Sequence, residues 1–193
     1  MPKKETTFRC VFVLTLIAVV CGLLLAILNP LLYVEPTVDD ILNNVTLEGD
    51  VKGSVEELDK DLAKAIKGGK VELVAKITAN GKEYIGLKVK TNSDGQLGEC
   101  EYAMLIDRET NKITQAKYIT DGSTAGRNYA TYGDKGENFD DYLIAITSSD
   151  VFKDYTYPRT GATKTCKAVN NAFIITANYY YNEYVEGGAG NEG

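Results

Sequence analysis

The sequence predicts an α+β protein, in which a single N-terminal transmembrane helix precedes one outward-facing domain of twisted antiparallel sheet packed with helices. Three observations support this. Residues 10–28 form a run of 19 residues without a charged side chain. Residues 70–91 and 100–120 each contain two alternating segments around turn-forming residues. Residues 166–177 carry apolar side chains at helical spacing. With 193 residues, the chain is large enough for one domain with a substantial core.

The uncharged run "CVFVLTLIAVVCGLLLAIL" is long enough to cross a bilayer as a helix. Three basic residues and one acidic residue precede it, which favours a cytoplasmic N-terminus. A cleaved signal peptide is the alternative, but its apolar region is normally only about 7–15 residues long and ends in a small-residue cleavage site, which is not evident here. A lipoprotein signal at Cys21 is disfavoured because Val20 is large. We therefore expect a permanent single-pass anchor in the cell membrane.

These expectations divide the chain into four parts. They are a cytoplasmic N-terminus at 1–9, a transmembrane helix at 10–34, an extracytoplasmic domain at 35–186 and a disordered tail at 187–193.

Charge and composition exclude several classes of function. The chain has a net charge of −6, residues 1–9 carry +2 and residues 10–34 carry none, so the rest carries −8. An acidic domain without a basic stripe is not expected to bind nucleic acid. Histidine is absent, which excludes Ser-His, Cys-His and His-metal chemistry. We expect no metal site and no catalytic residues.

Four cysteines are present. Cys10 and Cys21 lie in the apolar run, where they are best read as small apolar residues. Cys100 and Cys166 belong to the domain, and the sequence leaves open whether they form a disulfide.

Two helices are predicted at the start of the domain. Residues 35–45, "EPTVDDILNNV", read as a short helix near the membrane. Residues 54–69 read as a longer helix, with Ser54 as the N-cap, Glu57 closing a capping box and the two glycines at 68 and 69 ending it. The apolar face of this longer helix comprises Val55, Leu58, Leu62, Ala65 and Ile66.

Two β-hairpins follow. The segment "KVELVAKITANGKEYIGLKVKT" alternates on both sides of Asn80-Gly81, which is a strong hairpin signal. The segment "CEYAMLIDRETNKITQAKYIT" is a second pair of strands with its turn at 108–112.

The last third of the domain begins with a polar stretch, 121–137, that contains four glycines and reads as a loop. Residues 139–146, "FDDYLIAI", read as either helix or strand. The final helix is expected to bury the residues that recur at helical spacing, which are Cys166, Val169, Ala172, Phe173 and Ala177.

The stretch "TGATKT" at 160–165 stands directly before and within the start of this final helix. A helix N-terminus has free backbone N–H groups that attract anions, and glycine allows a phosphate to approach the backbone closely. Thr163 is placed to cap the helix, Thr165 falls in its first turn, and Lys164 and Arg159 add positive charge. The residues alone thus allow a small phosphate-binding turn, with an ordinary capped helix as the alternative.

"TGATKT" also resembles the Ser/Thr-Gly-Ala-Thr-x-Ser/Thr flavinylation motif of the FMN-binding domain family. Members include the single-span, flavin-carrying component of the Rnf electron-transport complex and its counterpart in the sodium-translocating NADH:quinone oxidoreductase. The resemblance implies that Thr165, the last residue of the motif, carries FMN through a phosphoester bond. The candidate cofactor-binding residues are Thr165, Thr160, Gly161, Ala162, Thr163 and Lys164.

The resemblance extends to the organisation of the chain. The family has one N-terminal span with its N-terminus inside, a flavin domain outside, and the motif near the C-terminus at the head of a helix. A strand–turn–strand unit before a glycine-bearing loop is also shared. The loop here, "DGSTAGRNY", lacks the proline of the family's Glu-Thr-Pro-Gly-Leu-Gly, and nothing firm is carried over to Gly122, Thr124 or Gly126.

The resemblance implies an electron-transfer subunit of a membrane redox-driven ion pump of the Rnf type. Such a subunit relays electrons through covalent FMN and is not catalytic alone. It implies multi-span flavin and iron–sulfur subunits as partners and a separate flavin transferase for maturation. One alternative is a free-standing surface flavoprotein that passes electrons to extracellular acceptors. The other is a non-redox, membrane-anchored binding module that uses Tyr179–Tyr181 and Tyr184 as contact residues. A tyrosine run of this kind, however, more often packs on its own domain than against a partner.

Overall fold

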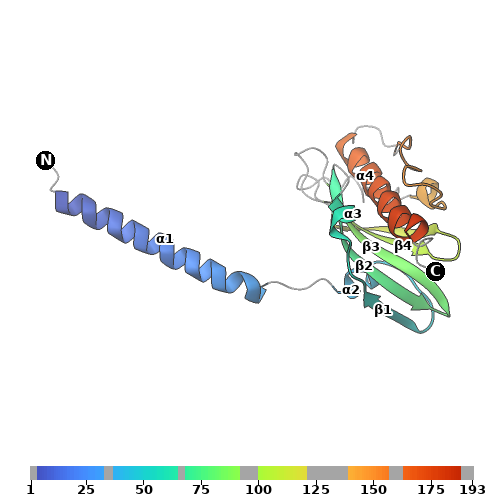
Figure 1. The fold of residues 1–193 in the computed structure, drawn as a ribbon, viewed down its shortest axis with the longest axis horizontal. Helices are drawn as coiled ribbons and strands as arrows, with labels where there is room; N and C mark the ends of the chain where they lie inside the picture. Colours follow the sequence, from blue (N-terminus) through green and yellow to red (C-terminus); the bar gives the residue numbers. More distant parts are fainter. Residues whose placement is uncertain are drawn as a thin grey trace, which may run out of the picture. The chain divides into compact units, whose positions relative to one another are not determined.

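The computed structural model describes residues 4–32, 37–64, 68–91, 100–120, 139–156 and 163–187 (Figure 1). The chain divides into two compact units, residues 1–36 and residues 37–193. The predictions for the 121–137 loop and for the tail beyond residue 187 lie outside the described residues.

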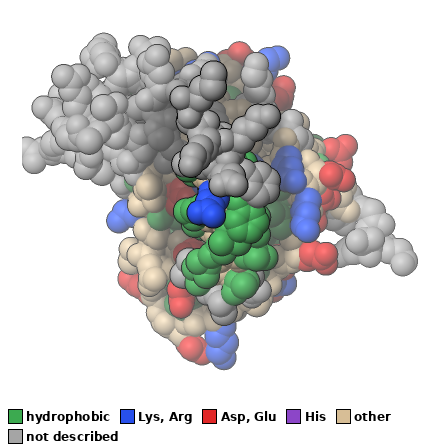
Figure 2. Space-filling view, turned by 90° about the vertical axis from the view of Figure 1, so that its left-hand side faces the viewer, with side chains coloured by type: hydrophobic (Ala, Val, Ile, Leu, Met, Phe, Trp, Pro, Cys, Tyr) green, Lys and Arg blue, Asp and Glu red, His purple; other side chains and the backbone are tan. Residues whose placement is uncertain are grey.

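The first unit consists of helix α1, Lys4–Leu32. Its segment Arg9–Leu28 is 20 residues long and apolar, and none of it is buried. At 1.5 Å per residue this segment extends for about 30 Å, the thickness of a bilayer core. Figure 2 shows its side chains as continuous hydrophobic surface, whereas charges of both signs are interspersed over the second unit. The predicted long apolar helix is therefore confirmed, and by length and composition it can cross a membrane, as can a signal sequence.

The second unit is built around one five-stranded antiparallel sheet in which every strand pairs with its neighbours in sequence, in the order β1-β2-β3-β4-β5. Both predicted hairpins are confirmed. The strands are β1 (Val51–Val55), β2 (Gly69–Ala79), β3 (Lys82–Thr91), β4 (Cys100–Asp107) and β5 (Lys112–Thr120).

The two tight turns follow from their residues. Asn80 and Gly81 both have positive φ, 52° and 76°, which is the backbone of a two-residue hairpin turn. In the second turn, Asp107 accepts hydrogen bonds from the backbone N–H groups of Glu109 (2.9 Å) and Thr110 (3.0 Å), and Asn111 has a φ of 53°. A carboxylate that caps its own turn in this way fixes the reversal of the chain.

The predicted helix over 54–69 is wrong in its first half. Ser54, the expected N-cap, lies in β1 and pairs with Lys76 of β2. The helix that forms, α3, covers only Lys60–Lys64, and Asp59 caps it by accepting from the N–H groups of Asp61 (2.8 Å) and Leu62 (3.0 Å). Pairing along β2 thus overrides the capping-box pattern.

The expected apolar face of that helix changes accordingly. Val55 is in the strand and 48% exposed, while Leu58 and Leu62 pack partly buried against the core. Ala65 and Ile66 lie outside the described residues.

One face of the sheet is covered by the long helix α4, Thr163–Tyr180, which lies across β2, β3 and β4 (Figure 1). The predicted final helix is confirmed, and all five residues of its expected apolar face are buried in the core. α4 continues into a π-helical turn, η3, Tyr181–Glu186.

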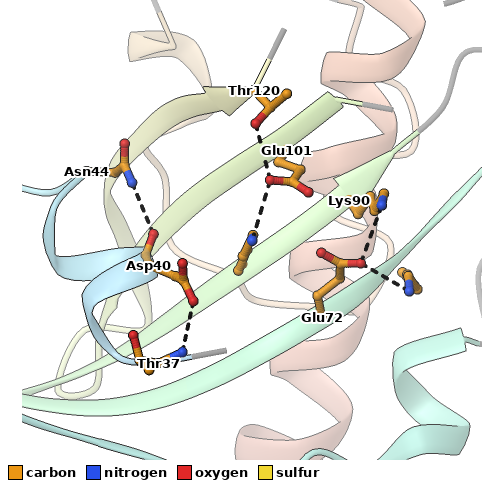
Figure 3. Close-up of polar contacts among 9 residues, drawn as sticks. Thr37, Asp40, Asn44, Glu72, Lys90, Glu101 and Thr120 are labelled. Carbon is orange, nitrogen blue, oxygen red and sulfur yellow. Dashed lines mark hydrogen bonds and ion pairs between the residues drawn. The ribbon is translucent and has the colours of Figure 1, made fainter. Parts of the chain in front are cut away.

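The opposite face is covered in part by the short helix α2, Asp39–Leu42, which lies within the predicted helical segment and buries Ile41 against the sheet. Beside the apolar cluster around Ile41, the same face carries charged side chains. Figure 3 shows Glu72 and Glu101 on it, with α4 behind the sheet. Glu72 pairs with Lys70 (3.1 Å) and Lys90 (3.7 Å), and Glu101 with Lys88 (3.4 Å). Alternation along the strands therefore gives an aromatic face toward α4 and a half-charged face away from it.

Residues 139–146 form neither the full helix nor the full strand allowed by the sequence. Asp140–Tyr142 is a single 3₁₀ turn, η2, and Ala145 makes one antiparallel bridge to Lys112 at the edge of the sheet.

Candidate functional site

The motif "TGATKT" is divided between the described and undescribed parts of the chain. Thr160, Gly161 and Ala162 lie outside the described residues. Thr163 is the first residue of α4, and Lys164 and Thr165 follow in its first turn. The prediction that a helix begins within the motif is confirmed, while the binding roles of its six residues stay predictions.

The backbone at this point has the properties of an anion-binding end. The first N–H groups of a helix have no carbonyl one turn earlier to bond to, and the helix dipole places partial positive charge there. The first turn of α4 contains no acidic residue and does contain Lys164. Its charges therefore favour a negatively charged group such as a phosphate.

The residues that follow the motif fix the start of α4 to the core. Cys166, Ala168 and Val169 are 9%, 0% and 1% exposed, whereas Lys167 between them is exposed. Because the second turn is packed against the sheet, a group bonded within the first turn would be held at a defined place on the domain.

Farther along the helix, Phe173 packs among aromatic rings. Its ring centroid lies 4.3 Å from that of Tyr142 in a stacked arrangement, and 5.5 Å from both Phe139 and Phe152. Such packing makes α4 a rigid support.

Asn170 is a structural residue that the sequence did not single out. Its Oδ1 accepts a hydrogen bond from the Tyr142 hydroxyl, and its Nδ2 donates to the backbone carbonyl of Tyr155. It thereby ties α4 to the segment around η2. A signal was available in the sequence, because the polar Asn170-Asn171 pair stands between the apolar residues Val169 and Ala172.

A second polar group lies inside the same core. The Tyr102 hydroxyl donates to the Tyr118 hydroxyl at 3.2 Å, and the ring centroids are 4.5 Å apart. Burial raises the pKa of Tyr118 far above its usual value, so this phenol stays neutral at physiological pH. Near it in the sheet, the Thr91 hydroxyl is buried and finds no hydrogen-bond partner among the described residues.

The structure also bears on two cysteines of the domain and on the tyrosine run at the end of α4. Cys100 and Cys166 are both buried in the core cluster that α4 shares with the sheet. Tyr179 and Tyr180 are 1% and 0% exposed, so the favoured interpretation, in which the tyrosine run packs on its own domain, is confirmed for these two residues. They pack on their own domain because they end the buried face of α4.

The other positions considered as binding sites give no further support for a site at the motif. Among the described residues, no three Cys, Asp or Glu side chains are grouped so as to hold a metal ion. Gly122, Thr124 and Gly126 fall in the undescribed 121–138 segment. Two hollows of about 340 and 390 Å³ are lined by residues of 46–48, the β2–β3 turn and β4–β5, and by none from α4. Neither belongs to the motif.

Comparison with known proteins finds no match to a family model, to a curated protein or to a solved structure.

Proposed function

We propose that this protein is a membrane-anchored flavoprotein that carries FMN covalently on Thr165 and relays electrons as a subunit of a membrane redox complex. One observation carries the proposal. The stretch "TGATKT" resembles a flavinylation motif, and its second half opens an 18-residue helix whose next turn is buried in the core.

The proposed linkage suits the chemistry of that position. A phosphoester on Thr165 places the FMN phosphate in the first turn of α4, where free N–H groups and the helix dipole stabilise an anion. Lys164 supplies a positive charge in the same turn. When bound, FMN accepts one or two electrons, and the protein has only to hold the cofactor and tune its environment. In this proposal FMN supplies the redox chemistry and the protein only binds it, which agrees with a chain that contains no histidine and for which we assign no catalytic residues.

We propose partner subunits because helix α1 contains no side chains that could conduct an ion. α1 has no charged side chain between Cys10 and Leu28, and a single apolar helix offers no pathway for an ion. Ion transport therefore belongs to other subunits, for which we propose multi-span flavin and iron–sulfur proteins. The basic residues before the span favour a domain outside the cytoplasm.

A second candidate keeps the flavin but not the complex. A domain of mixed surface charge that follows one apolar helix along the chain also suits a free-standing surface flavoprotein that reduces extracellular acceptors (Figure 2). Purification from native membranes in mild detergent separates the two, because only the first predicts co-purifying multi-span partners.

The experiment that tests the flavin is expression of the full chain with a flavin transferase, followed by intact mass and in-gel fluorescence after denaturation. We expect wild type to carry an FMN-sized mass increment and fluorescence that survive denaturation. Thr165→Ala should lose both, and Thr165→Ser, which keeps a hydroxyl at this place, should retain them. Equal melting temperatures of the three proteins exclude unfolding as the cause.

Two results would overturn the proposal. One is an unmodified wild-type mass while the same transferase labels a known substrate protein. The other is a label that persists in Thr165→Ala. A colourless wild-type protein would favour the non-redox binding module instead.

A further inference from the structure

The two edges of the five-stranded sheet differ in how far the rest of the chain covers them. Along β5, the backbone N–H of Ile113 donates to the carbonyl of Ile144 at 3.0 Å. The side chain of Gln115 also makes two hydrogen bonds, of 2.8 and 2.6 Å, with the backbone of Thr46. Proteins cover an edge strand in this way because its unpaired N–H and C=O groups invite another strand. β1, at the other edge, pairs with β2 on one side, and no other described segment pairs with it (Figure 1).

The register of β1 identifies the backbone groups that it turns outward. Directly after β1, the N–H of Glu56 donates to the carbonyl of Val74 at 3.0 Å and continues the β1–β2 register. In an antiparallel ladder, opposite residues alternate between pairs that exchange hydrogen bonds and pairs that do not. Counting back from Glu56, Ser54 and Lys52 bond to β2. The N–H and C=O groups that point away from the sheet therefore belong to Val51, Gly53 and Val55.

The side chains of β1 are also accessible. Residues 52–55 are exposed. Val55, at 48%, is the one exposed large apolar side chain among the described residues of the second unit. Lys52 Nζ lies 3.3 Å from Asp50 Oδ2, so the positive charge of the strand is offset within the same chain. The strand thus lacks the row of like charges that often protects an open edge.

We propose that β1 pairs antiparallel with β1 of a second copy of this chain, across a two-fold axis at Gly53, so that the two sheets form one continuous sheet. In this register the outward groups of Gly53 meet those of the second Gly53, and those of Val51 meet those of Val55. Each such pair exchanges two backbone hydrogen bonds. The contact is isologous, with the same strand supplied by both copies.

The spacing of the residues in β1 favours a second copy as the partner. Val51 and Val55 are equally far from Gly53 along the strand, so the exposed Val55 comes to lie beside Val51 of the second copy, and all five strand residues overlap. A shift by one residue along the partner, which is the next that keeps outward groups opposite each other, is less favourable. It leaves three overlapping residues, and in one direction it sets Lys52 opposite Lys52, where like charges repel.

The charges at the ends of the paired strands are also compatible. In the proposed register Lys52 lies opposite the uncharged Ser54 of the second copy and diagonal to its Glu56. Asp50 faces the same Glu56 just beyond the strands. The positive charge of Lys52 lies next to both carboxylates and offsets their repulsion.

A pair of five-residue strands gives a weak contact by itself. Stable interfaces bury at least about 1,000 Å², and two short strands offer less. An anchor changes this, because two copies in one bilayer meet at a high effective concentration. We therefore expect the pairing in membranes rather than in dilute detergent. The inference rests on the proposed anchoring by α1 and is independent of the flavin.

The test is disulfide cross-linking of the full chain in phosphatidylcholine liposomes. Cys10→Ala and Cys21→Ala first remove the exposed native cysteines. One tagged chain then carries Lys52→Cys, and a differently tagged chain carries Ser54→Cys. In the proposed register these positions face each other as a pair without hydrogen bonds, with Cα atoms about 4.5 Å apart, which suits a disulfide. A mild oxidant should give a covalent dimer with both tags, and flotation with the liposomes checks the anchoring separately.

Matched variants assign the register and the strand. Lys52→Cys on both chains places the cysteines diagonally, about 7–8 Å apart, and should cross-link severalfold less because this exceeds the reach of a disulfide. Val55→Pro, added to the facing cysteines, removes an outward N–H without removing a bond to β2. It should lower cross-linking to the level of the diagonal pair. Val55→Ile keeps the N–H and an apolar side chain and should leave cross-linking unchanged.

The proposal is overturned if the facing and diagonal cysteines cross-link equally in liposomes that carry the anchored chain. It is also overturned if Val55→Pro keeps the near-ultraviolet circular dichroism of wild type and cross-links as before. Should Val55→Pro not fold, the comparison of facing with diagonal cysteines decides alone. In native membranes, a cross-link from Lys52→Cys to a different protein, with none between copies, would assign the edge to that protein and overturn the pairing.

Discussion

Phe173 is the residue whose truncation most directly tests how α4 is held on the sheet. Its side chain is fully buried, and its ring contacts three others, those of Tyr142, Phe139 and Phe152. Phe173→Ala leaves a cavity in this aromatic cluster, since the neighbouring rings are themselves fixed by the sheet and by η2. The predicted result is a large loss of stability in the second unit.

The magnitude follows from the burial. Removing a fully buried phenylalanine side chain costs about 3–5 kcal/mol, part of which is the loss of ring–ring contacts. For a domain of about 150 residues, each kcal/mol lowers the midpoint of thermal unfolding by about 2–4 °C. We therefore expect Phe173→Ala to lower the midpoint by about 6–20 °C. Val55→Ala, at a strand position that is 48% exposed, should cost less than about 1 kcal/mol.

Near-ultraviolet circular dichroism of the full chain in detergent is the suitable assay. None of the 13 tyrosines lies in α1, and all except Tyr33 belong to the second unit, so the tyrosine signal reports mainly on that unit even while α1 stays helical in the micelle. A drop for Phe173→Ala no larger than that for Val55→Ala would refute the packing described here.

Two further changes test the sheet. Two backbone N–H groups hold the pKa of Asp107 below its ordinary value of 3.8, so its carboxylate stabilises the fold above that value, and this contribution is lost as pH falls through the folded pKa. Asp107→Asn should lower the free energy of unfolding near neutral pH by about 1 kcal/mol. It should also reduce the loss of stability that wild type shows on acidification, as measured by urea unfolding at a series of pH values. An unchanged loss of stability in acid would contradict this. Gly69→Ala would place a methyl 2.3 Å from the backbone oxygen of Lys90, which cannot move without breaking the ladder, and should cost at least about 1–3 kcal/mol in the same assay. Gly86→Ala meets only the ends of isoleucine side chains and should cost clearly less, so equal losses for the two glycines would count against this contact.

Much of the fold could be predicted because short-range signals agree with long-range packing. Asn80-Gly81 can adopt the positive φ values that the first hairpin requires, and the alternation on either side matches the two faces of the sheet. The helix predicted from Ser54 failed because a capping box is a local pattern worth about 1 kcal/mol. Five cross-strand pairs between Val51–Val55 and β2 outweigh it, and no sequence window that ends at residue 69 contains both partners.

Of the candidate site, only the motif at residues 160–165 could be predicted from the sequence. Its six residues stand out in the sequence because a glycine and three threonines surround the predicted start of a helix, and the start of α4 at Thr163 agrees with that. The contacts of Asn170 and the pairing of Tyr102 with Tyr118 could not be predicted in the same way. They join residues that are far apart in sequence, and their partners are set by the register of the sheet and by the position of η2.

The order of elements along the chain has a consequence for biosynthesis. β1 to β5 pair only with their sequence neighbours, so the sheet can assemble strand by strand as the chain emerges. Most of its aromatic face, however, stays uncovered until α4 has been made, because α3 and the segment around η2 supply only a part of the core that packs on it. A ribosome that stalls before residue 163 would release a sheet whose apolar face lacks α4. Such fragments should be readily degraded by quality-control proteases. Thr165, the proposed attachment residue, is made together with the helix that completes the domain, so a flavin transferase that requires folded substrate would never label an unfinished chain.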